Sequence, residues 1–241
     1  MLHNDAASVS ATRSYLTQSK LPQAELTSEV VYLVHADQTV RQEVSEFLHA
    51  LEMKVIEFSC GAEYLDFDGT DGAACVVLGL NLPDISGLEL QLRLPQKGNP
   101  PTIFIGDHSD VVSTVRAMKA GAIDFLTRPI DPGALLEAVE TAFERDLHAR
   151  RQKSELVTLE NRLATLTPRE RDVLPLIVGG LLNKQAASVL GISEVTLQVH
   201  RSRAMRKMKA QSVADLVRMT AKLGILSESE EPGAYKSYRN T

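Results

Sequence analysis

The chain has 241 residues, of which 44% are hydrophobic and 24% charged, and its formal net charge is −5. This composition is typical of a globular protein with room for two domains, and it excludes a disordered or fibrous chain. The absence of a long apolar run excludes a membrane-spanning helix, and the N-terminus lacks the apolar core of a secretory signal. Two cysteines are too few for a disulfide framework, so we expect a cytoplasmic protein with no membrane partner.

The two parts of the chain carry opposite charge. Residues 1–150 contain 22 acidic and 11 basic side chains, whereas residues 151–226 contain 13 basic and 6 acidic side chains. A basic segment within an acidic protein favours nucleic-acid binding confined to that segment. The alternative explanation is a surplus of lysine and arginine on solvated helices.

Residues 1–28 are rich in Ser, Thr, Ala and Gln without a sustained period, which predicts a flexible N-terminal tail. From Val30 onward, short apolar strands alternate with amphipathic helices. The strands lack a period of two, which is typical of a parallel sheet buried on both faces. We therefore predict a doubly wound α/β domain over residues 29–146. Its strands are expected at 30–34, 55–58, 75–80, 102–105 and 125–127, and its helices at 40–51, 88–94, 111–120 and 132–144.

Three landmarks of this domain resemble the receiver domain of response regulators, which has a flavodoxin/CheY-like fold. They are LPDISG after the third strand, AMKAGAIDFL before the end of the fifth strand, and the Arg128-Pro129 step. The resemblance implies a site at the carboxyl ends of the strands. In a receiver, two acids there hold Mg²⁺, an aspartate accepts phosphate, and a hydroxyl and a lysine complete the site.

This sequence departs from the receiver pattern at each of those positions. The acid pair is replaced by His35 and Ala36, the phosphoacceptor by Gly79, the hydroxyl by Gly106 and the lysine by Arg128. Mg²⁺ prefers carboxylate oxygens, and glycine has no nucleophile, so we predict a receiver that is not phosphorylated at this place and holds no metal or cofactor.

Several uses of the altered pocket remain open. His35 and Arg128 could bind a small anion, or a protein partner could dock there. Alternatively, Arg128 could be neutralised by Asp37, Asp84 or Asp107, or those three aspartates could form a substitute phosphorylation site. Phe125 stands where receivers keep an aromatic switch residue, but we interpret it as an ordinary core residue.

A helical linker is predicted over residues 147–165. Leu156, Leu159, Leu163 and Leu166 follow heptad spacing, which favours a short seam for pairing with a second copy. One long helix could run through this segment, or two helices could be separated by a solvated break.

The segment 166–226 has the plan of an all-α helix-turn-helix domain. Thr167-Pro168-x-Glu170 predicts a capping box at the start of the first helix, and a second helix is expected from Asn183. Gly191 to Ser193 then forms a short turn into a basic third helix. A last helix over 213–223 and a flexible tail over 227–241 complete the prediction.

The motifs LTPRERDVL, GLLNKQAASVLGIS and TLQVHRSRAMRKM resemble the output domain of LuxR/FixJ-type response regulators. The resemblance implies a transcription regulator of a two-component system that binds double-stranded DNA as a homodimer. In the family, the last helix pairs two output domains on DNA.

The third helix supplies the expected DNA contacts. Thr196, Gln198 and Val199, followed by Arg201 or Ser202, are expected to reach base edges, and Ser193 is expected to cap the helix. Val195, Leu197, Met205 and Met208 are predicted to lie in the core. Phosphate contacts are predicted for Lys184, Arg203, Arg206 and Lys207, and a backbone or phosphate contact for His200.

The sequence therefore predicts a DNA-binding transcription regulator, not an enzyme, that works independently of aspartate phosphorylation. The alternatives are an anion-sensing regulator that uses the pocket of His35 and Arg128, and an adaptor that binds other proteins. The basic side chains of the third helix argue against the adaptor.

Overall fold

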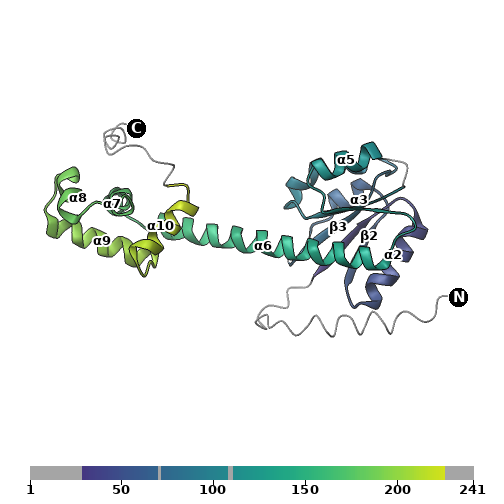
Figure 1. Ribbon diagram of the computed structural model, residues 1–241, viewed down its shortest axis with the longest axis horizontal. Helices are drawn as coiled ribbons and strands as arrows, with labels where there is room; N and C mark the ends of the chain where they lie inside the picture. Colours follow the sequence, from purple (N-terminus) through teal and green to yellow (C-terminus); the bar gives the residue numbers. More distant parts are fainter. Residues whose placement is uncertain (1–28, 70–71, 108–110, 226–241) are drawn as a thin grey trace. The chain divides into compact units, whose positions relative to one another are not determined.

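The computed structural model describes residues 29–69, 72–107 and 111–225, and it divides between Arg150 and Arg151 into two compact units. The first unit is an α/β domain and the second is helical (Figure 1), which confirms the predicted fold class. The predicted tails over 1–28 and 227–241 lie outside the described residues. None of the helices in the described part of the chain combines the length and apolarity that crossing a membrane requires.

Five parallel strands form the sheet of the first unit, in the order β2-β1-β3-β4-β5. Their bounds are β1 (Val30–Val34), β2 (Lys54–Phe58), β3 (Ala74–Gly79), β4 (Thr102–Gly106) and β5 (Asp124–Thr127). The strand order reverses direction between β1 and β3, and the carboxyl ends of strands at such a switch point are where doubly wound domains bind ligands.

Helices cover both faces of this sheet (Figure 1). On one face, α2 (Gln38–Ala50) and α6 (Pro132–Ala164) pack against side chains such as Leu33. On the other face, α3 (Gly61–Asp66), α4 (Gly87–Arg93), the 3₁₀ helix η1 (Leu94–Lys97) and α5 (Val111–Lys119) surround side chains such as Tyr32. The short helix α3 was not predicted, because six residues are too few to display a helical period.

The second unit packs four short helices around one core. The core includes Val173, Leu197 and Leu216, which come from three different helices. The helices are α7 (Pro168–Val178), α8 (Asn183–Leu190), α9 (Glu194–Met208) and α10 (Val213–Lys222). The predicted capping box of Thr167 and Glu170 is confirmed at the start of α7, and the predicted cap of α9 by Ser193 is confirmed as well.

Helix α6 runs to Ala164 without a break, which decides between the two linker arrangements left open by the sequence. The leucine seam is largely covered within the second unit: Leu166 is part of its core, Leu163 packs against that core, and Leu159 is buried. Glu155 of α6 also forms an ion pair with Lys222 of α10, with 2.6 Å between Oε1 and Nζ. Three of the four leucines of the predicted seam are therefore used for packing inside the second unit, whereas Leu156 is 38% exposed.

Candidate functional site

The carboxyl edge of the sheet brings together the residues that we predicted to stand in place of the receiver's phosphorylation machinery. His35 directly follows β1, Gly79 ends β3, Gly106 ends β4, and Arg128 directly follows β5. The register places them side by side, because Val34 pairs with Leu78 and Gly106 pairs with Thr127. Ala36 lies exposed beside them.

The imidazole of His35 lies directly over Gly79. A Cβ atom on residue 79 would be only 2.6 Å from Cδ2 of His35, a contact so close that one of the two groups would have to shift. His35 is only 8% exposed, and its Nδ1 accepts a hydrogen bond of 3.1 Å from the backbone N–H of Asp37. Burial lowers the pKa of His35, because the charged imidazolium is poorly solvated there. A neutral imidazole therefore occupies the space next to Gly79, the position that we predicted to correspond to the receiver's phosphoacceptor.

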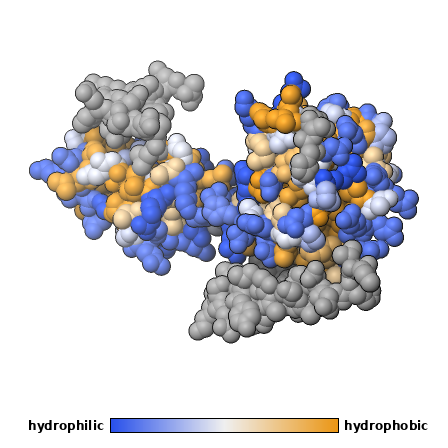
Figure 2. All heavy atoms as spheres, turned by 45° about the vertical axis from the view of Figure 1, so that its right-hand side comes forward, coloured by the Kyte–Doolittle hydropathy of each residue, from blue (hydrophilic) through white to orange (hydrophobic). Residues whose placement is uncertain are grey.

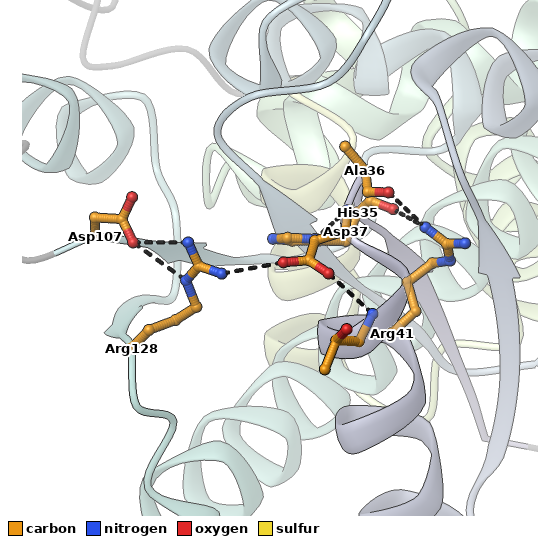
Figure 3. A network of polar contacts seen from close by, with 7 residues as sticks. His35, Ala36, Asp37, Arg41, Asp107 and Arg128 are labelled. Atoms are coloured by element: carbon orange, nitrogen blue, oxygen red, sulfur yellow. Dashed lines mark hydrogen bonds and ion pairs between the residues drawn. The ribbon is translucent and has the colours of Figure 1, made fainter.

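Arg128 is held between two carboxylates (Figure 3). Its Nε and Nη2 donate to Oδ1 of Asp107 at 3.1 and 2.9 Å, and its Nη1 donates to Oδ2 of Asp37 at 3.4 Å. The hydrogen bonds to Asp107 raise the pKa of Arg128. The guanidinium charge is thus matched by neighbours, as one of the alternatives above predicted, and this weakens the hypothesis of an anion pocket.

Asp84 lies in a different environment from Asp37 and Asp107. Its two carboxylate oxygens accept hydrogen bonds from the backbone N–H groups of Gly61 (3.0 Å) and Ala62 (2.7 Å) at the start of α3. Partial burial acts to raise the pKa of Asp84, but these N–H groups outweigh it and the net shift is downward. The structure does not gather the three aspartates into a substitute phosphorylation site, and no metal-binding group of His, Cys, Asp or Glu occurs among the described residues.

Gly106 forms a second close contact of the same kind, with Phe125. A Cβ atom on residue 106 would be 2.6 Å from Cζ of Phe125 and 2.9 Å from Cδ1 of Leu80. The ring of Phe125 also stacks on Phe104, with centroids 6.3 Å apart. Phe125 therefore packs against the core as predicted, in space that the absence of a side chain on Gly106 leaves open.

Helix α9 presents most of its predicted DNA contacts to solvent. Ser193 caps the helix by accepting a hydrogen bond of 3.1 Å from the backbone N–H of Thr196. The inward side of the helix includes Leu197 and Met208, both buried as predicted. The exposed set is Thr196, Gln198, Val199, Ser202, Arg203 and Arg206 on α9, together with Lys184 on α8.

Two of the predicted DNA contacts are instead engaged inside the unit. Nη1 of Arg201 donates to Oδ1 of Asn183 at 2.7 Å and so joins α9 to the start of α8. Nζ of Lys207 lies 2.6 Å from Oε2 of Glu170, which is buried, and so joins α9 to α7. Of the two candidates for the next outward position, the structure exposes Ser202 and half-buries Arg201. His200 is also half-buried, and its Nδ1 is a buried atom without a hydrogen-bond partner in the structure.

Val195 does not lie in the core, so the prediction made for it was wrong. Its exposed fraction is 73%, whereas Leu197 is 1% exposed. Positions two residues apart lie about 200° apart around a helix, so Val195 and Leu197 could not share an inward face. The sequence analysis consequently missed Val195 as a surface residue of the candidate nucleic-acid interface.

Comparison with known families agrees with this division. Residues 31–140 match the response regulator receiver domain, and residues 164–220 match the bacterial regulatory proteins of the luxR family. Together with the fold, these matches define the class of protein: a response regulator in which a receiver is joined to a luxR-type helix-turn-helix.

Known proteins match this chain over most of their length. Nodulation protein W of Bradyrhizobium diazoefficiens is 39% identical over 85% of this chain and 91% of its own length. The transcriptional regulatory protein FixJ of Rhizobium meliloti is 38% identical over 80% of this chain and 96% of its own. The solved structure of the response regulator StyR is 38% identical, covers 81% of this chain and 99% of its own, and superposes with a TM-score of 0.72. The chain belongs to the family of FixJ-like response-regulator transcription factors.

Proposed function

We propose that this transcription factor binds double-stranded DNA without phosphorylation of its receiver. The observation that carries the proposal is the packing of His35 on Gly79, because the acceptor position has no nucleophile and the space above it is already filled. Arg128, bound by Asp107 and Asp37, supplies no free cation for an incoming phosphoryl group.

Helix α9 is the element that we expect to enter the major groove. Thr196, Gln198, Val199 and Ser202 are exposed near its N-terminal half, where helices of this kind meet base edges. Exposed cationic side chains flank them and suit phosphate contacts: Lys184, Arg203 and Arg206. Arg201 and Lys207 are assigned to holding α9 against α8 and α7.

We further propose that the receiver unit forms a homodimer through α5. Val111, Val112, Val115 and Met118 are 66, 64, 46 and 42% exposed, and Leu92 of α4 is 73% exposed. Hydrophobic residues gather along the upper edge of this unit in Figure 2, where α5 lies in Figure 1. We infer a second copy as the occupant, because helix-turn-helix dimers bind two half-sites and an apolar surface can pair with itself across a two-fold axis.

The decisive experiment compares the unmodified protein with the same protein treated with acetyl phosphate and Mg²⁺. DNA affinity is measured on a duplex selected from a random pool, and phosphate incorporation is measured by intact mass. We expect no added phosphate and an unchanged dissociation constant. A phosphoryl group on any residue of the receiver, accompanied by tighter DNA binding, would overturn the proposal.

A further inference from the structure

Helix α9 has an outward row of side chains whose chemistry changes along its length. Val195, Val199, Ser202 and Arg206 follow one another at spacings of four, three and four residues, which places them on one face. All four are exposed, whereas Leu197, Ala204 and Met208 on the opposite face are buried. The outward row thus begins with two apolar side chains and ends with a cation.

The two valines form a continuous apolar edge on the outward row. Val195 is 73% exposed and Val199 is 43% exposed, so each offers its methyl groups to solvent in the free protein. Residues four apart on a helix have Cβ atoms about 5–6 Å apart. Stacked base pairs rise about 3.4 Å each. The pair of valines therefore spans one to two base steps.

The position of this apolar edge on α9 points to DNA bases as its occupant. The N-terminal residues of a helix-turn-helix recognition helix meet the base edges, and Val195 is the second residue of α9. Its neighbours Thr196 and Gln198 are exposed polar residues, and the cations Arg203 and Arg206 lie further along, in positions suited to phosphates. A valine has neither donor nor acceptor, so it cannot bond to the N7 or O6 atoms of purines. The apolar group that the major groove offers is the 5-methyl group of a pyrimidine.

We propose that Val195 and Val199 together read pyrimidine 5-methyl groups in the major groove, with Val195 as a specificity-determining residue. The inference rests on the proposed DNA contact of α9. The same methyl group occurs in thymine and in 5-methylcytosine. The contact would discriminate by burying the methyl group against the valine side chains, and by leaving a polar base edge without a partner where no methyl group is present.

The test uses the full-length protein and a duplex that it selects from an unmethylated random pool. Each thymine is replaced in turn by deoxyuridine, which removes only the 5-methyl group. We expect binding to weaken about threefold to fivefold at one or two positions, the effect of one buried methyl group. In a second arm, each cytosine is replaced by 5-methylcytosine, and tighter binding would extend the contact to the methylated base.

Val195→Thr is the informative variant, because it keeps the shape of the side chain while replacing one methyl group with a hydroxyl. Its preference for the thymine duplex over the deoxyuridine duplex should be smaller than that of the wild type. Val157→Thr on α6 is the matched control, since Val157 is also exposed, at 46%, and this variant should discriminate like the wild type.

The outcomes separate the inference from the function on which it rests. Salt-dependent DNA binding that is indifferent to both base replacements would overturn methyl reading and leave DNA binding intact. Discrimination that persists in Val195→Thr and Val199→Thr would also overturn it, because another residue would then make the contact. A protein that selects no duplex at all would refute the proposed DNA contact itself.

Discussion

The imidazole of His35 and the backbone of Gly79 form a matched pair, in which Cδ2 lies 2.6 Å from the place where a Cβ atom would stand. We infer that His35 stands where a receiver has an acid that holds a metal, and Gly79 where it has the acid that accepts phosphate. The ring of the first residue fits only because the second has no side chain. Restoring one position alone therefore cannot rebuild a receiver site.

We predict that Gly79→Ala destabilises the first unit by about 1–3 kcal/mol, the usual effect of forcing extra volume into a packed site. The double variant His35→Ala/Gly79→Ala should recover much of that loss, because the clashing ring is gone. Urea unfolding measures both. Gly69→Ala is the control, since a Cβ atom there would meet only Oη of Tyr32, at 3.7 Å. Equal losses in the single and double variants would show that the clash lies elsewhere.

The buried Glu170 should make the second unit sensitive to acid. The hydrogen bond from Lys207, followed by that from the backbone N–H of Thr167, lowers the pKa of Glu170 to about 2 from an ordinary value of 4.5. A carboxyl whose pKa is lower in the folded state stabilises fully above its unfolded pKa. This contribution should therefore be present above pH 4.5 and be lost as the pH falls from about 4.5 towards 2. Thermal unfolding across that range measures it.

The variant Lys207→Met tests whether the ion pair of Glu170 and Lys207, and not protonation of other groups, causes the loss of stability in acid. Without the ammonium group, the pKa of Glu170 should rise towards its unfolded value, so the stability lost below about pH 4.5 should be smaller than in the wild type. Arg206→Met is the matched control, because Arg206 is the exposed neighbour of Lys207 and should leave the acid profile unchanged. Identical acid profiles for wild type and Lys207→Met would contradict the assignment.

The sequence predicted the fold well where local signals were strong. All five strands, the capping box of Thr167 and Glu170, and the cap at Ser193 follow from apolar runs and from residue types at helix starts, which depend on near neighbours. Helix α3 escaped prediction because part of what supports its start comes from a distant residue: Asp84 accepts hydrogen bonds from Gly61 and Ala62.

The candidate site could be located but not built from the sequence. The positions of Gly79 and Gly106 followed from the resemblance to receivers, yet the rings of His35 and Phe125 that pack on them depend on tertiary contacts. Tertiary contacts also decide which basic residues of α9 are free to meet DNA, and the sequence does not show those contacts. Charge alone could not distinguish Arg203, which is exposed, from Lys207, which is paired with a buried glutamate 37 positions away.

The exposed apolar residues of α5 form the proposed dimer interface, and a charged side chain introduced there should dissociate the dimer. Val112→Glu and Val115→Glu place carboxylates in an interface that would be dry, so the protein should sediment as a monomer at micromolar concentration. Val157→Glu, on an equally open position of α6, should remain a dimer. A wild-type protein that sediments as a monomer in the same range would rule out pairing through α5.

The salt dependence of DNA binding distinguishes the exposed arginines from the internally bound ones. Each phosphate neutralised by a cation releases counterions, and the slope of log K against log salt changes by about 0.9 per contact on duplex DNA. We predict that Arg203→Ala and Arg206→Ala each reduce the slope by about that amount, and weaken binding similarly on all sequences.

Arg201→Ala should leave the slope unchanged, because its guanidinium is bound to Asn183 at 2.7 Å. Its effect should appear instead as lower thermal stability of the second unit. If Arg201→Ala reduced the slope as much as Arg203→Ala, the internal hydrogen bond would have to open on DNA, and Arg201 would join the set of phosphate contacts.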